Sequence, residues 1–322
     1  MPIKEIPLEE LDAEKFIAEQ VQAIQGAAGD HIVMNALSGG VDSAVVTLLG
    51  HRALGDQLKT YYVDTGLMRA GEAGQVSGWF AELGVPIEVV DASAQFFAAL
   101  RGLTDPEEKR ERGITQVFYK DVFAKLLREA GARVLLQGTN FTDVEETSAG
   151  VKRQHNVFEQ IGINPEEAFG YKVYEPILPL RKPAVRALGR ALGLPPELAD
   201  RPPFPGPALA ARIIGEVTPE RVDTVRQATR IVEEALADSG AFQYLAVLHE
   251  DRVTGMRDGR RDFGQQIEIR CWDSQDAAAG TPTDVPFATL RSMADRITEE
   301  VPGVVSVTYN IAAKPPSCIE AV

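Results

Sequence analysis

A short run of small and acidic residues, Ser38–Ser43 (SGGVDS), carries the clearest chemical potential of this 322-residue sequence. Its two adjacent glycines can adopt positive φ angles and let backbone amides approach a ligand closely. Serine hydroxyls at both ends can donate further hydrogen bonds. Asp42 would repel a phosphate unless a Mg²⁺ ion lay between them, and Mg²⁺ commonly uses one or two carboxylates together with phosphate oxygens. The run therefore predicts a site for a polyphosphate and a magnesium ion.

The residues around this run predict a strand before it and a helix after it. Ile32–Leu37 is a short, mostly apolar run, and an apolar helical pattern continues to Leu54. The unpaired amides and partial positive charge at a helix N-terminus favour a bound anion. The turn has neither the G-x-x-x-x-G-K-S/T pattern of P-loop kinases nor the G-x-G-x-x-G pattern of dinucleotide sites. A plain strand–turn–helix with a serine or aspartate cap is the structural alternative, and the full six-residue string in this context favours the phosphate site.

Strands and helices alternate over the first two hundred residues, which predicts a parallel sheet with helices on both faces. In such sheets ligands bind at the carboxyl ends of the strands. We therefore expect chemistry in the loops after Leu37, Val63 and Gln137. The expected strands are 32–37, 59–63, 86–90 and 133–137, and the expected helices are 11–26, 72–83, 116–129 and 183–192.

Prolines crowd the segment Leu194–Pro207 and predict a domain boundary, because proline continues neither a helix nor a central strand. The order of elements then changes to an α+β pattern. We expect an α/β domain over 1–200 and a smaller α+β domain over 201–322. The expected elements of the second domain are helices 219–236 and 288–300 and strands 243–248, 265–272 and 304–311.

Charge and cysteine content exclude several classes of protein. Thirty-three Lys and Arg residues against 47 Asp and Glu residues give a net charge of −14. A surface that acidic opposes general binding to nucleic acid or to an anionic membrane. Two cysteines are too few for a disulfide framework. With no apolar run long enough for a membrane span and no signal-peptide pattern, we expect a cytoplasmic protein.

Longer strings indicate a family. SGGVDS after a strand resembles the PP-loop of ATP pyrophosphatases, which split ATP into AMP and pyrophosphate. Six further strings resemble, in the same order, the ATP-pyrophosphatase subunit of GMP synthetase. They extend over nearly the whole chain, and PFPGP and the KPP-x-x-IE tail are much more specific than SGGVDS. The strings lie at 61–72 (YYVDTGLMRAGE), 102–110 (GLTDPEEKR), 135–147 (LLQGTNFTDVEET), 151–157 (VKRQHNV), 201–220 (RPPFPGPALAARIIGEVTPE) and 312–320 (AAKPPSCIE).

The resemblance implies an activity and a nucleotide site that requires ATP and Mg²⁺. Family members aminate xanthosine monophosphate (XMP) to GMP: ATP adenylates the purine C2 oxygen, and ammonia then displaces AMP. The residues that the resemblance assigns to ATP fall into groups. Pyrophosphate and Mg²⁺ would be held by Ser38, Gly39, Gly40, Asp42 and Ser43, with Asp143 as a second metal ligand; adenine or ribose would lie near Val63 and Asp64; Gln137, Gly138 and Thr139 would line the cleft; Lys152 and His155 would sit on a lid, and Lys182 would reach the phosphates.

The resemblance also implies an acceptor site and partners. The second domain would form a homodimer and bind the acceptor nucleotide. A glutaminase needs a nucleophilic cysteine on a strained turn, and neither Cys271 nor Cys318 has that setting. Ammonia would therefore come from solution or from a separate glutaminase. The residues that match the acceptor site are Arg212, Gln243, Arg270, Lys314, Ile319 and Glu320.

The match departs from the family pattern mainly in the lid and the acceptor half. Gln154 stands where the lid usually has the first of two histidines, 158–171 is a longer insertion, and Cys318 stands where the family has threonine. These departures leave two alternatives open. One is a divergent PP-loop paralogue that adenylates another acceptor for amination or thiolation. The other is a nucleotide-binding sensor without turnover.

Overall fold

The chain forms two compact units that interleave along the sequence. The computed structural model describes residues 3–148, 170–257, 259–275 and 279–321. The first unit comprises Met1–Asp64, Glu72–Asp91 and Phe118–Arg201, and the second comprises Thr65–Gly71, Ala92–Val117 and Pro202–Val322. Two early segments thus pack with the carboxyl-terminal part of the chain. The predicted boundary between a first domain over 1–200 and a second domain over 201–322 stays a prediction.

A five-stranded parallel sheet with the order β3-β2-β1-β4-β5 forms the centre of the first unit. The chain first forms β1, adds β2 and then β3 on one side of it, and later adds β4 and β5 on its other side. In an open parallel sheet, this reversal marks the crevice where ligands bind, beyond the carboxyl ends of the strands. The strands are β1 (Val33–Leu37), β2 (Leu58–Asp64), β3 (Glu88–Asp91), β4 (Val134–Leu136) and β5 (Lys172–Tyr174).

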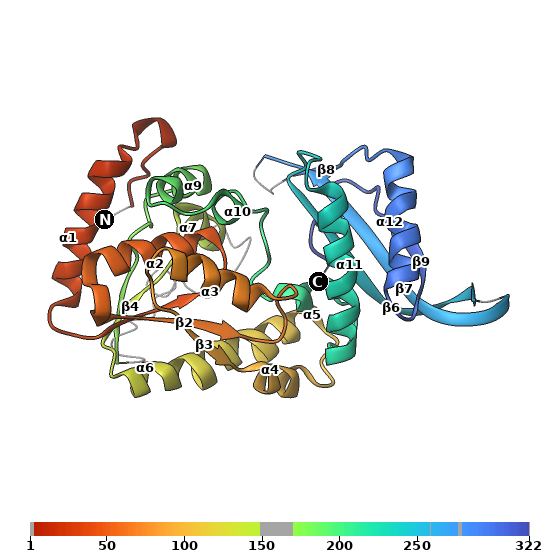
Figure 1. The fold of residues 1–322 in the computed structure, drawn as a ribbon, viewed down its shortest axis with the longest axis horizontal. Helices are drawn as coiled ribbons and strands as arrows, with labels where there is room; N and C mark the ends of the chain where they lie inside the picture. Colours follow the sequence, from red (N-terminus) through yellow and green to blue (C-terminus); the bar gives the residue numbers. More distant parts are fainter. Residues whose placement is uncertain (1–2, 149–169, 258, 276–278, 322) are drawn as a thin grey trace. The chain divides into compact units, whose positions relative to one another are not determined.

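Helices cover the sheet, and α1, α2 and α9 lie together on one of its faces (Figure 1). Their apolar side chains and those of the inner strands form one continuous core. Asp12 caps α1 by accepting a hydrogen bond from the Lys15 amide at 3.1 Å. The helices of this unit are α1 (Ala13–Ala28), α2 (Val41–Leu54), α3 (Glu72–Glu82), α6 (Ala124–Ala130), α7 (Phe141–Ser148), α9 (Lys182–Ala191) and α10 (Pro196–Ala199), with 3₁₀ turns at Leu8–Glu10 and Gly55–Gln57.

The chain before α6 is wound more widely than the single α-helix that the sequence predicts over 116–129. Lys109–Thr115 and Val117–Phe123 are π-helical, and α6 begins only at Ala124. A π-helix has hydrogen bonds between residues five apart, and its wider turn brings side chains at that spacing closer together than an α-helix does. The rings of Phe118 and Phe123 show this spacing, since they stack with centroids 5.7 Å apart.

In the second unit, two helices pack on a four-stranded mixed sheet (Figure 1). Its central strand β7 runs antiparallel to β6 and β8 and parallel to β9. The elements are α4 (Ser93–Leu100), α5 (Pro106–Glu108), the 3₁₀ turn η6 (Ala208–Arg212), α11 (Pro219–Leu236), β6 (Gln243–Arg257), β7 (Arg260–Asp273), β8 (Thr281–Pro282), α12 (Phe287–Glu300) and β9 (Val304–Tyr309).

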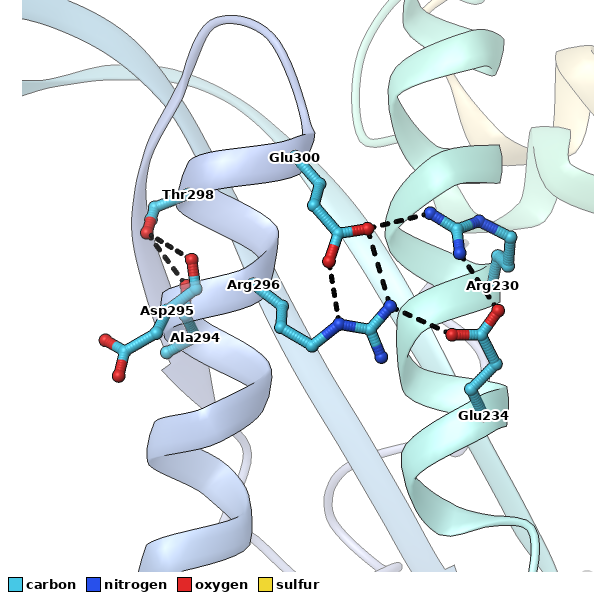
Figure 2. A network of polar contacts seen from close by, with 7 residues as sticks. All are labelled: Arg230, Glu234, Ala294, Asp295, Arg296, Thr298 and Glu300. Atoms are coloured by element: carbon cyan, nitrogen blue, oxygen red, sulfur yellow. Dashed lines mark hydrogen bonds and ion pairs between the residues drawn. The ribbon is translucent and has the colours of Figure 1, made fainter.

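A ring of four charged side chains joins α11 to α12 (Figure 2). Arg230 and Arg296 each contact both Glu234 and Glu300, at 2.7–2.9 Å. Hydrogen bonds from the two arginines lower the pKa of both glutamates. The ring fixes how these two helices pair at their exposed side.

The structure confirms the predicted fold class, an α/β parallel-sheet unit and an α+β unit. Every strand expected from the alternation is present, with boundaries shifted by a few residues. Helices α4 and α7 and the short strand β5 were not among the elements expected from the sequence. No helix in the described ranges is long and apolar enough to cross a membrane.

Candidate functional site

The run Ser38–Ser43, here called the phosphate turn, connects β1 to α2 at the carboxyl edge of the sheet. Gly39 has a φ of +78°, a conformation that favours glycine. Hydroxyl groups close the turn: the Ser38 amide donates to Ser43 Oγ at 3.1 Å, and Ser43 Oγ donates to the Gly40 carbonyl at 3.0 Å. The N-cap of α2 is Gly40, and in the described part of the chain no side-chain cap hydrogen bond is made there, which suits the first amides of α2 to an anion.

Asp42 and Lys182 face each other at this turn. Asp42 lies in the first turn of α2, and Lys182 is the first residue of α9. The Lys182 ammonium forms an ion pair with Asp42 Oδ2. The other carboxylate oxygen, Oδ1, is buried without a hydrogen-bond partner within the described residues. A buried carboxylate oxygen without a donor suits a hard cation such as Mg²⁺.

The described residues contain no group of three or more His, Cys, Asp or Glu side chains that could hold a metal ion by themselves. A magnesium ion at Asp42 would therefore depend on oxygens from a bound ligand. Such a mixed set of ligands is the usual way in which Mg²⁺ binds with nucleoside phosphates. The residues present thus fit the ion that the sequence predicts.

Buried polar side chains anchor the start of α2 to the sheet. Asn35 in β1 donates to Thr47 Oγ1 at 2.6 Å and accepts from Thr60 Oγ1 in β2 at 2.7 Å. Thr47 in turn donates to the Ser43 carbonyl at 2.8 Å. Asn35, Thr47 and Thr60 are almost fully buried, and fully satisfied buried networks fix one arrangement of the backbone. This chain of bonds holds the phosphate turn in register with β1 and β2.

The loop after β4 packs against the phosphate turn. A Cβ atom on Gly138 would lie 3.2 Å from backbone atoms of Asp42 and Ser43, so glycine permits this close approach. Gln137 Nε2 donates to Thr139 Oγ1 at 3.2 Å, and Thr139 Oγ1 donates to Glu175. The structure thus brings the predicted nucleotide residues of this loop next to the turn.

The remaining residues predicted to bind ATP lie at the end of β2, in α7 and outside the described part of the chain. Val63 is buried near the end of β2, and Asp64 is its last residue. Asp143 Oδ2 accepts the Asn140 amide at 3.0 Å, which places this carboxylate at the start of α7. Its assignment as a metal ligand stays a prediction. Lys152 and His155 lie outside the described residues.

A second group of predicted residues meets in the other unit, and we call Arg212, Gln243, Arg270, Ile319 and Glu320 the acceptor cluster. Arg212 donates to both oxygens of Glu320 at 3.3 and 3.4 Å, and Gln243 Nε2 donates to Glu320 Oε1 at 2.6 Å. Arg212 is 1% exposed, and its Nη1 has no hydrogen-bond partner in the described part of the chain. Leaving a charged donor unsatisfied in a buried site is costly. This nitrogen therefore suits an anionic or carbonyl oxygen of a ligand.

Arg270 positions the backbone of the tail. Its Nη1 donates to the carbonyls of Cys318 and Ile319 at 2.9 and 3.3 Å, and its Nε donates to Glu268 at 2.7 Å. Because the bond at position 318 uses the main chain, cysteine can serve there in place of threonine.

Glu268 also accepts hydrogen bonds from Asn310 at 2.9 Å and faces His249 Nε2 at 2.7 Å. Burial alone would raise the pKa of Glu268, but hydrogen bonds from Arg270, Asn310 and His249 outweigh it and lower that pKa.

A buried lysine holds the loop that follows Arg212. Lys109 Nζ donates to the carbonyls of Ile213 and Gly215 at 2.8 and 3.0 Å. Burial, helped by the charge of Arg221, lowers the pKa of Lys109 to about 8.

The predicted acceptor residue Lys314 pairs through its backbone with Gly280, at 2.8 and 3.1 Å. Its role in the acceptor site stays a prediction.

Comparison with known proteins tests the resemblance. The family model described as "GMP synthase C terminal domain" matches residues 230–321, and the one described as "Asparagine synthase" matches residues 25–140. Similar curated proteins include those of Archaeoglobus fulgidus (43% identity, 96% of this chain and 99% of the relative), Methanoregula boonei (44%, 95% and 98%) and Pyrococcus furiosus (43%, 95% and 97%). Each is named as the B subunit of glutamine-hydrolyzing GMP synthase.

The chain belongs to the family of GMP synthase B subunits. The predicted family resemblance is thereby confirmed, over almost the full length of the chain. The phosphate turn lies within the first matched region, and Gln243, Arg270 and Glu320 lie within the second. Lys182 and Arg212 lie between the two matched regions.

Several residues that contact the phosphate turn or the acceptor cluster in this chain were not predicted from the sequence. Glu72 is 2% exposed on α3 and shares the buried face of that helix with Val76 and Phe80. A charged residue that continues an apolar row at intervals of four was a detectable signal. Arg201 and Glu268 carried no such signal, because their contacts depend on residues distant in sequence.

Proposed function

We propose that this chain is the synthetase component of a two-subunit GMP synthase, which converts XMP, ATP and ammonia to GMP, AMP and pyrophosphate. The observation that carries this proposal is 43% identity over 96% of the chain with a protein named as a GMP synthase B subunit. The phosphate turn and the acceptor cluster support it, since they supply sites suited to a polyphosphate and to a second polar ligand.

The reaction divides into two balanced steps. The C2 oxygen of XMP attacks the α-phosphorus of ATP, the bond to the β-phosphate oxygen breaks, and pyrophosphate leaves. Ammonia then adds to C2 and gives up a proton, and the C2–O bond breaks to release AMP. Both steps need orientation and stabilisation of phosphate charge more than they need a protein nucleophile.

The residues of the phosphate turn would act mainly on the pyrophosphate group. The amides at the start of α2 would donate to its oxygens, and Lys182 would exchange its contact with Asp42 for one with a phosphate. Asp42 would hold Mg²⁺, which neutralises phosphate charge when bound. In the acceptor cluster, Arg212 would donate to an acceptor oxygen, while Glu320 would accept hydrogen bonds from the purine ring.

The names of the relatives, which mark them as one of several subunits, support a partner. We propose that ammonia comes from a separate glutaminase, that the chain forms a homodimer, and that it acts in the cytoplasm. The environment of the buried cysteine fits this proposal, because burial raises the pKa of Cys271 and makes it a poor nucleophile.

Turnover by the purified chain tests the function. With ATP, Mg²⁺, XMP and ammonium chloride it should form GMP, AMP and pyrophosphate in equal amounts. Glutamine alone should give no product until a glutaminase partner is added. Inosine monophosphate, which lacks the C2 oxygen, is the matched control and should release no pyrophosphate. Binding of ATP without turnover on XMP would contradict the proposal, and pyrophosphate release with another acceptor would identify a paralogue.

A further inference from the structure

Helix α3 places a buried carboxylate directly against the phosphate turn. Glu72, the first residue of α3, is 2% exposed. A Cβ atom on Gly39 would lie only 2.9 Å from Glu72 Oε1. A buried carboxylate is costly unless it is paired, and an unpaired one here would also repel a phosphate ligand. Some group must therefore neutralise Glu72.

Arg201 supplies that charge and also reaches the turn. Its Nη1 donates to Glu72 Oε1 at 2.7 Å and lies 3.4 Å from the Gly39 carbonyl, to which it also donates. The Arg201 side chain is 15% exposed. Its own carbonyl accepts a hydrogen bond from Arg186 Nη2 at 3.0 Å. Arg186 belongs to α9, the helix that begins at Lys182, so Arg201 is held through both its side chain and its backbone.

Contact with the Gly39 carbonyl fixes the direction of the next amide. In a planar trans peptide, the carbonyl and the following N–H point in opposite directions. With its oxygen turned toward Arg201, the peptide between Gly39 and Gly40 must point the Gly40 N–H away from that guanidinium. The Gly40 amide instead donates to Ser38 Oγ at 3.4 Å. Rotation of this peptide would remove a donor from the phosphate site.

We propose that Glu72 and Arg201 are a positioning pair for the phosphate turn, which holds the Gly39–Gly40 peptide in the orientation that binds the phosphates of ATP. The pair acts through the turn and touches no reacting atom. The proposal rests on the proposed function in one respect, that the ligand of the turn is a nucleoside triphosphate.

The test compares nucleotide binding in charge-removed variants. Arg201→Met strands the Glu72 carboxylate and should raise the Kd of a non-hydrolysable ATP analogue with Mg²⁺ at least about tenfold. The double variant Glu72→Gln with Arg201→Met has no stranded charge and should bind the analogue no more weakly than Arg201→Met alone. Arg201→Lys keeps the charge and should show an intermediate loss. KM for ATP should rise in each variant, while KM for XMP should change less than about twofold.

The pair Arg190 and Asp200 provides the matched control. Like Arg201 and Glu72, these two residues form an ion pair between an arginine and a carboxylate, at 2.5 Å, but both of their side chains are about half exposed. Arg190→Met should leave the Kd of the analogue unchanged. An unaltered Kd in Arg201→Met, or a parallel rise of both KM values, would overturn the positioning role. Wild-type protein that binds the analogue but forms no GMP would refute only the proposed function.

Discussion

The phosphate turn and the acceptor cluster are built in different ways. The turn consists of consecutive residues between a strand and a helix, and the groups that we propose to bind a ligand are chiefly backbone amides that the sheet positions. The acceptor cluster joins side chains from η6, β6, β7 and the tail, and it is held by bonds among its own charged groups. The first site thus takes its shape mainly from local backbone geometry, although Lys182 and Arg201 contact it from distant parts of the sequence. The second depends entirely on long-range pairing.

This difference has a consequence for ligand binding. Amides at a helix N-terminus need no rearrangement to accept an anion. In the acceptor cluster, Glu320 already accepts bonds from Arg212 and Gln243. A ligand that binds Glu320 must compete with these bonds, so its net affinity is the difference between two sets of contacts. Mutations should therefore act more simply at the turn than in the cluster.

The largest expected effect concerns the carboxylate of the phosphate turn. Asp42→Asn keeps the shape of the side chain but removes the charge that faces Lys182 and that would hold Mg²⁺. We expect kcat to fall at least about a hundredfold, with a raised Mg²⁺ requirement in assays of pyrophosphate release. Asp56→Asn, an exposed residue at 55–57, is the matched control. Normal turnover by Asp42→Asn would show that the phosphate turn does not need a carboxylate at position 42.

A smaller and more selective effect is expected in the acceptor cluster. Arg212→Met removes a buried guanidinium whose Nη1 has no partner in the described residues. KM for XMP should rise roughly tenfold to a hundredfold, the value of one or two charge-assisted hydrogen bonds. The Kd of the ATP analogue should stay constant. Arg291→Met, an exposed arginine of α12, is the control. Loss of ATP binding in Arg212→Met would show that the two sites are not separable in this way.

The parts of the site that the sequence predicted are those with local causes. SGGVDS lies between an apolar strand and an apolar helix, and both elements formed within two residues of their expected ends. Gly138 could be assigned because it follows the next strand at the same edge of the sheet. In both cases, hydrophobic periodicity determines where the backbone must turn.

Other parts depend on contacts that no local pattern encodes. Arg201 stands 129 positions after Glu72, yet the two form an ion pair. Glu268 binds His249 and Asn310, which neighbouring strands bring together. The π-helical winding before α6 was missed because its periodicity is too close to that of an α-helix to be told apart over so short a segment. Which residues distant in sequence come into contact depends on the topology of the fold, and residue types alone do not determine that topology.

The smallest expected effect concerns the ring between α11 and α12, where charge pairing stabilises the fold rather than a ligand site. The folded-state pKa values of Glu234 and Glu300 are lowered by hydrogen bonds from Arg296 and Arg230. A lowered pKa means that the stabilisation is complete above the ordinary glutamate pKa, about 4.5, and is lost as the pH falls through the lowered values. Solvent screens these exposed pairs, so the effect is small.

The double variant Glu234→Gln with Glu300→Gln tests this statement. Its Tm at pH 7 should be lower than that of the wild type by about 1–3 °C. The difference should shrink as the pH falls below the ordinary glutamate pKa and through the lowered values of the wild type. High salt should also reduce the difference at pH 7. Glu299→Gln, an exposed neighbour on α12, should not change the Tm. A difference that does not shrink as the pH falls would mean that the two helices pair through packing alone.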